Sequence, residues 1–70
     1  MMDKYKKIIY WSNEDNRFIV EVPELPGCMS DGATEEEALL NISTIISEWI
    51  DTAKILGREI PQPATRAVFA

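Results

Sequence analysis

Few side chains in this sequence could perform chemistry. The chain contains one cysteine, Cys28, and no histidine, so neither its thiol nor any serine hydroxyl has the imidazole base that usually activates such nucleophiles. A lysine or a carboxylate could act as the general base instead. We interpret Cys28 as a small, partly buried strand residue rather than a catalytic thiol.

Carboxylates are the second group to consider. Glu21, Asp31 and Glu35 could converge around a Pro-Gly loop and bind a metal for phosphodiester hydrolysis. A ribonuclease H-type site would also need an acid early in the first strand, and residues 5–12 contain none. We therefore expect no catalytic residue, no metal site and no cofactor, and we do not expect an enzyme.

The distribution of charge points to a protein partner. Lys4, Lys6 and Lys7 alternate with aromatic residues, as in some single-strand nucleic-acid sites, but the net charge of −5 opposes phosphate binding. No Lys or Arg lies between Arg17 and Lys54. The acids of that interval form either a solvated surface or a patch that steers a basic protein. Our candidate contacts for such a partner are Glu21, Glu24, Asp31, Glu35 and Glu36.

The first half of the chain predicts a small antiparallel sheet. Residues 5–12 are rich in aromatic and β-branched types, and the polar turn 13–16 separates them from an alternating strand over 17–22. Residues 23–27 end that strand, because proline cannot donate to a ladder. A short third strand near 28–30 returns along the hairpin and ends at Asp31-Gly32.

A long helix is predicted over residues 35–56. Thr34 and Glu37 form a capping box at its start, and Gly57 provides a left-handed stop. We interpret Trp49 primarily as a core residue and only secondarily as a contact for a partner. The apolar stripe consists of Ala38, Ile42, Ile45, Trp49, Ala53 and Leu56, widened by Leu39, Ile46 and Ile50.

Residues 1–70 are thus predicted to form a single α+β domain, in the order β-β-β-α-β. The sheet over about 5–32 has three to four antiparallel strands, and the helix packs on one of its faces. In the C-terminal extension 58–70, residues 58–63 are an extended linker, and 65–69 add a possible edge strand.

One helix covers one face of a sheet, yet the first strand is apolar on both faces. A 70-residue chain also has a small core, and one cysteine cannot form an intrachain disulfide. We therefore expect a homodimer or higher assembly, with Ile9, Trp11 and Ile19 as candidates for self-association. The cysteine usage and the lack of a long apolar run favour a cytoplasmic protein without a membrane span.

The stretch Pro23-Glu24-Leu25-Pro26-Gly27-Cys28 resembles the HicB-like antitoxin family. Ser30, Gly32, Thr34, the acidic run 35–37, Ala38-Leu39 and Asn41 continue the likeness. The stretch 57–63, Gly-Arg-Glu-Ile-Pro-Gln-Pro, is similar to that family's exit from its helix. The resemblance covers roughly residues 5–63, so it is far more specific than a short motif.

This resemblance implies a partly degraded ribonuclease H-like fold without catalytic carboxylates. It implies the antitoxin of a prokaryotic type II toxin–antitoxin pair, which occludes a small basic RNA-cleaving toxin of the HicA-like kind. Only seven residues follow Pro63, so we expect no autonomous DNA binding. The alternative is a stand-alone oligomeric interaction module with another partner. Pro23, Pro26 and Gly27 are interpreted as structural turn residues.

Overall fold

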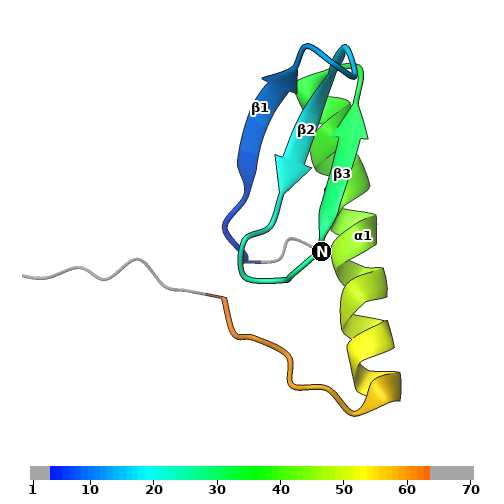
Figure 1. Ribbon diagram of the computed structural model, residues 1–70. Helices are drawn as coiled ribbons and strands as arrows, with labels where there is room; N and C mark the ends of the chain where they lie inside the picture. Colours follow the sequence, from blue (N-terminus) through cyan, green and yellow to red (C-terminus); the bar gives the residue numbers. More distant parts are fainter. Residues whose placement is uncertain (1–3, 64–70) are drawn as a thin grey trace, which may run out of the picture.

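The computed structural model describes residues 4–63 as a three-stranded antiparallel sheet and one long helix (Figure 1). Strands β1 (Ile8–Ser12), β2 (Arg17–Glu21) and β3 (Met29–Gly32) lie in the order β1-β2-β3, and helix α1 (Glu35–Leu56) follows. This confirms the predicted α+β class with one helix on one face of the sheet. The predicted strand over 65–69 lies outside the described residues.

The strand register divides the sheet into two faces. Ile9 pairs with Val20 and Trp11 with Phe18, and the fully buried Val20 belongs to the core beneath the helix. We call this the inner face. Its members are Ile9, Trp11, Phe18, Val20, Ser30 and Gly32, while the outer face carries Ile8, Tyr10, Ser12, Arg17, Ile19, Glu21, Met29 and Asp31.

The predicted bounds of all three strands differ in the structure, and β2 ends at Glu21 rather than at Val22. β1 begins at Ile8 rather than at Tyr5, because Tyr5 is buried in the core and its hydroxyl donates to the carbonyl of Pro61. β3 begins after Cys28 and includes Asp31 and Gly32, which were expected to end it. These two residues pair with Ile19 and Phe18 of β2, so the ladder itself extends the strand.

Helix α1 has the predicted bounds, because both ends are set by capping residues that are adjacent to it in the sequence. Thr34 Oγ1 accepts the Glu37 backbone N–H at 3.1 Å, and Gly57 adopts the left-handed conformation at φ 68°. The carboxylate of Glu37 accepts the N–H of Ala33 at 3.4 Å. A capping box would use the N–H of Thr34 instead, one residue further along the chain.

The helix lies towards one edge of the sheet. It packs mainly on β3, less on β2, and barely reaches β1. Gly32 permits this close approach, since a Cβ there would lie 2.5 Å from the backbone nitrogen of Ala38. Leu56, predicted to belong to the buried stripe, is 62% exposed. A 22-residue helix is about 33 Å long, while a five-residue strand spans about 17 Å, so the last turns extend past the sheet.

We expect Leu25→Ala to lower the free energy of unfolding by about 2–5 kcal/mol, because Leu25 is fully buried in the core. Leu40→Ala deletes the same atoms from a helix residue that is 73% exposed. It should change stability by no more than about 0.5 kcal/mol. Urea denaturation of both variants measures the difference, and equal losses would contradict this description of the core.

Candidate interaction surface

The loop between β2 and β3 is tied to the rest of the domain. The N–H groups of Leu25 and Cys28 donate to the carbonyls of Val22 and Leu25, at 3.1 and 2.9 Å, so two turns follow each other. Gly27 supplies the positive φ of 78° in the second turn. The Trp49 indole N–H donates to the Pro26 carbonyl at 3.0 Å, which fastens the loop to α1.

Half of the acidic residues lie at one end of the molecule. There, the hairpin turn between β1 and β2 lies beside the end of β3 and the start of α1 (Figure 1). This end holds six of the 12 acidic residues and one of the 7 basic residues. The rest of the sequence has six of each, so the net charge of −5 belongs to this end. We call it the acidic end, and its members are Glu14, Asp15, Asp31, Glu35, Glu36 and Glu37.

Arg17 is the basic residue of the acidic end. Its Nε lies 3.1 Å from Asp31 Oδ2 and its guanidinium lies 3.3 Å from Glu37 Oε1, which joins β2 to β3 and to the first turn of α1. All three side chains are more than a third exposed, so these ion pairs add little stability. Glu35 and Glu36 are exposed and make no ion pair within residues 4–63.

The structure separates the five acids that were candidate partner contacts. Asp31, Glu35 and Glu36 lie together at the acidic end, whereas Glu21 and Glu24 lie at the opposite end of β2 and in the following loop. Glu24 accepts the backbone N–H of Lys6 at 3.1 Å. Sequence reasoning missed Glu14 and Asp15, because only the fold shows that the hairpin turn lies beside the helix start.

The three self-association candidates lie on two different faces of the sheet. Ile9 and Trp11 lie on the inner face, and Trp11 contacts Phe18 edge to face with ring centroids 5.0 Å apart. Ile19 lies on the outer face and is 9% exposed. Three further outer-face residues, which were not among the self-association candidates, expose large apolar side chains: Ile8 (43%), Tyr10 (41%) and Met29 (47%).

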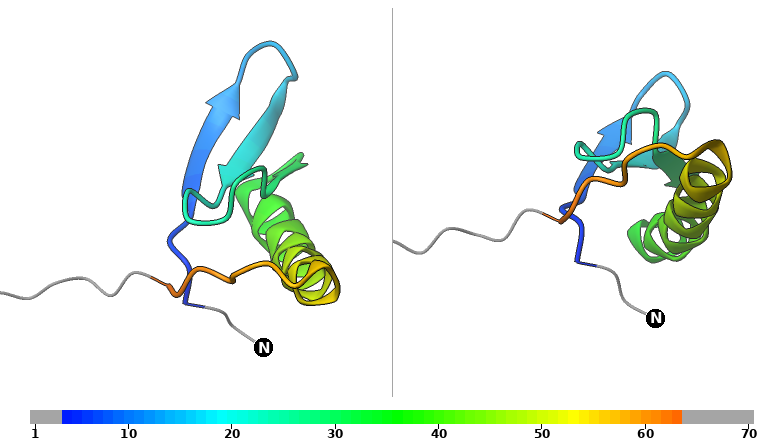
Figure 2. Two further views of the ribbon diagram at one scale, coloured as in Figure 1. Left: turned by 60° about the horizontal axis from the view of Figure 1, so that its bottom comes forward. Right: turned by 90° about the horizontal axis from the view of Figure 1, so that it is seen from below.

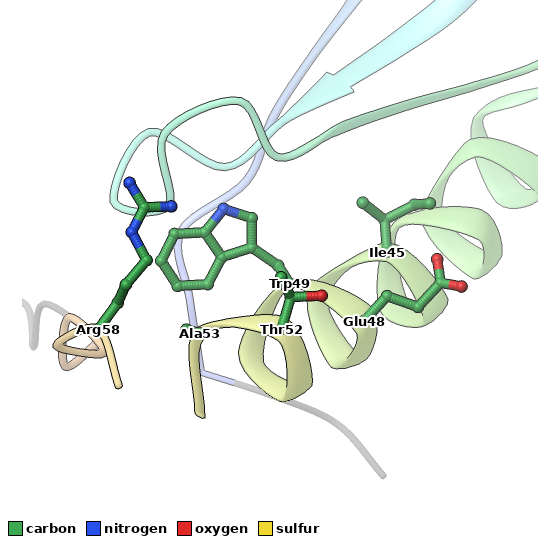
Figure 3. Close-up of a pocket in the computed structure, with 6 residues that line it drawn as sticks. All are labelled: Ile45, Glu48, Trp49, Thr52, Ala53 and Arg58. Atoms are coloured by element: carbon green, nitrogen blue, oxygen red, sulfur yellow. The ribbon is translucent and has the colours of Figure 1, made fainter. Parts of the chain in front are cut away.

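A hollow of about 330 Å³ lies beside the C-terminal half of α1 (Figure 3). Arg58 extends alongside the Trp49 ring there, and Glu48 is the carboxylate of the lining. Glu48 and Arg58 supply one charge of each sign, and Thr52 adds a hydroxyl group to the lining. Cys28 is 2% exposed and is not among the residues that line this hollow.

The described residues offer no metal site and no membrane span. Within residues 4–63, no three histidine, cysteine, aspartate or glutamate side chains gather closely enough to hold a metal ion. Glu21, Asp31 and Glu35 accordingly do not converge. Across the same residues, no helix combines the length and the apolar character needed to cross a bilayer.

Comparison with known proteins gives three matches. A family model described as a HicB_like antitoxin of bacterial toxin–antitoxin system matches residues 5–69. The UPF0150 protein Ta0767 of Thermoplasma acidophilum is 40% identical over 55 residues, which are 79% of this chain and 80% of that protein. The UPF0150 protein ssl0259 of Synechocystis is 30% identical over 54 residues, 77% and 74% of the two chains. No solved structure matches the chain significantly.

The phenol of Tyr10 provides a probe of the outer face. Desolvation raises its pKa above the ordinary 10.0, and a hydrogen bond to Glu21 with the charges of Glu21 and Asp15 raises it further. We expect Glu21→Gln to lower the pKa of Tyr10 and Asp15→Asn to lower it less. A residue-resolved NMR titration of the tyrosine rings measures both, and an unchanged pKa in Glu21→Gln would contradict the contact.

Proposed function

The chain belongs to the HicB_like antitoxin family of bacterial toxin–antitoxin systems, and from this premise we propose that it binds a small basic ribonuclease toxin of the HicA-like kind and covers its active site. Inhibition by covering an active site needs a complementary surface and no catalytic group on the antitoxin. The antitoxin role follows from the family. The kind of toxin and the mode of inhibition are the proposal.

The acidic end is the observation that supports a basic partner. Six carboxylates against one guanidinium place the whole net charge of the chain on one end. A concentrated field of this kind accelerates encounter with a basic protein and orients it. Glu35 and Glu36 stand at the centre of the proposal because both are exposed and unpaired within the described residues.

The test uses the small basic protein encoded beside this chain. The two are co-expressed with a tag on one of them, and RNA cleavage by the partner is assayed with and without this chain. A stable complex that abolishes cleavage supports the proposal. A partner that neither binds nor loses its activity, or the lack of any such neighbour, overturns it and favours a stand-alone interaction module with a different partner.

We expect the double variant Glu35→Lys/Glu36→Lys to raise the Kd for the toxin roughly tenfold or more, and more steeply at low salt, since close charge pairs at interfaces are each worth on the order of 1 kcal/mol or more. Glu48→Lys/Asp51→Lys is the matched control, with the same change of net charge on another part of α1. Calorimetric titration at two salt concentrations measures both. Equal effects of the two variants would contradict a toxin site at the acidic end.

A further inference from the structure

A second hollow, of about 400 Å³, lies on the first half of α1. Glu36, Leu39, Leu40 and Ser43 line it, and their spacing of three and four positions places them along one side of the helix. The small side chain of Ser43 leaves room beside the two leucines. Its hydroxyl donates to the Leu39 carbonyl at 3.5 Å, one turn earlier, so the lining is mainly apolar apart from the Glu36 carboxylate. We call this the leucine hollow.

Leu40 lies on the side of α1 that is turned away from the core. It is midway between the buried residues Ala38 and Ile42, and at 100° per residue this places it on the opposite side of the helix. Accordingly, its side chain is 73% exposed. Single exposed leucines are common, but Leu40 forms a hollow together with Leu39 and directly beside the carboxylate of Glu36. An apolar centre with a charged rim is the usual anatomy of a protein-binding site.

The leucine hollow lies away from the point where the described chain ends. After α1, the chain runs to the segment before β1, where the Tyr5 hydroxyl donates to the Pro61 carbonyl (Figure 2). α1 packs mainly on β3, at the other edge of the sheet, and the leucine hollow belongs to the half of α1 at the acidic end. The strand that the sequence predicts over 65–69 would extend the sheet, and it would therefore leave this side of the helix to a partner.

Charge favours a basic protein over a second copy as the occupant of the leucine hollow. Glu36 belongs both to its lining and to the acidic end, which carries the net charge of −5. A contact between two copies about a twofold axis at the leucine hollow would bring two acidic ends together, and like charges across an interface are costly. A basic partner gains attraction from the same carboxylates.

We propose that the leucine hollow is the apolar anchor of the toxin contact and receives an apolar side chain that is flanked by lysine or arginine on the toxin. The basic side chains pair with Glu35 and Glu36, while the apolar side chain packs on Leu39 and Leu40. This inference rests on the toxin proposal above and adds the chemistry of the toxin segment. The charges speed up the encounter, whereas the desolvated apolar contact slows dissociation.

The first test compares two exposed apolar residues of α1. Leu40→Ala should raise the Kd for the toxin roughly tenfold, and by the same factor at low and high salt, because an apolar contact is not screened. Ile55→Ala is the matched control: it removes the same number of carbon atoms from a residue that is 84% exposed near the other end of α1. It should leave the Kd within about twofold. Calorimetric titration measures both variants.

The outcomes separate the anchor from the toxin proposal. If Glu35→Lys/Glu36→Lys weakens binding but Leu40→Ala does not, the anchor is wrong and the toxin site at the acidic end stands. If neither change weakens binding, both proposals fail at this end of the molecule. Equal losses in Leu40→Ala and Ile55→Ala would also overturn the anchor, because the apolar contact would then not be specific to the leucine hollow.

A fluorescent label identifies what fills the leucine hollow. In Leu40→Cys of the full chain, a polarity-sensitive thiol dye labels the new cysteine selectively, since Cys28 is 2% exposed. We expect the emission of a solvated dye in the free chain and a blue shift when the toxin is added, with little change in labelled Ile55→Cys. A dye that is already blue-shifted overturns the proposal. Independence from protein concentration would then identify a segment of this chain, such as residues 64–70, and a rise with concentration would identify a second copy.

Discussion

The width of a single helix constrains this fold. A helix with its side chains is about 10–12 Å across, whereas three strands at about 4.8 Å spacing form a wider sheet. Here α1 packs on β3 and β2, and Gly32 has no side chain to keep the helix away. The fully buried residues Val20 and Ile42 therefore belong to β2 and α1. Within residues 4–63, β1 pairs with β2, and α1 covers little of its inner face.

Segments without regular structure complete the core where the helix does not reach. Leu25 enters it from the loop and is fully buried, and Tyr5 enters it from the segment before β1. The bond from Trp49 to Pro26 holds the loop against the helix. The Pro-Glu-Leu-Pro-Gly motif, which carries much of the family resemblance, thus has a structural task, while the exposed charges at the acidic end lie elsewhere in the chain.

Sequence reasoning succeeded where the determinants are local. The bounds of α1 follow from Thr34 and Gly57, which act within one turn, and the alternation in 17–22 assigned Phe18 and Val20 to the same face. Sequence reasoning could not say which residues of β1 share a face with which residues of β2. That register depends on the hairpin turn, where Asn16 adopts a positive φ of 54°. Arg17, 14 and 20 positions from Asp31 and Glu37, is likewise paired only by the folded topology.

The hydrogen bond from Tyr5 to Pro61 joins residues 56 positions apart. It brings the segment before β1 and the segment after α1 together at the end of the molecule opposite the acidic end (Figure 1). Lys4 and Pro63, the first and last residues that the structure describes, therefore lie on the side away from the acidic end. Attachment of the domain at this side would leave the acidic end facing solution.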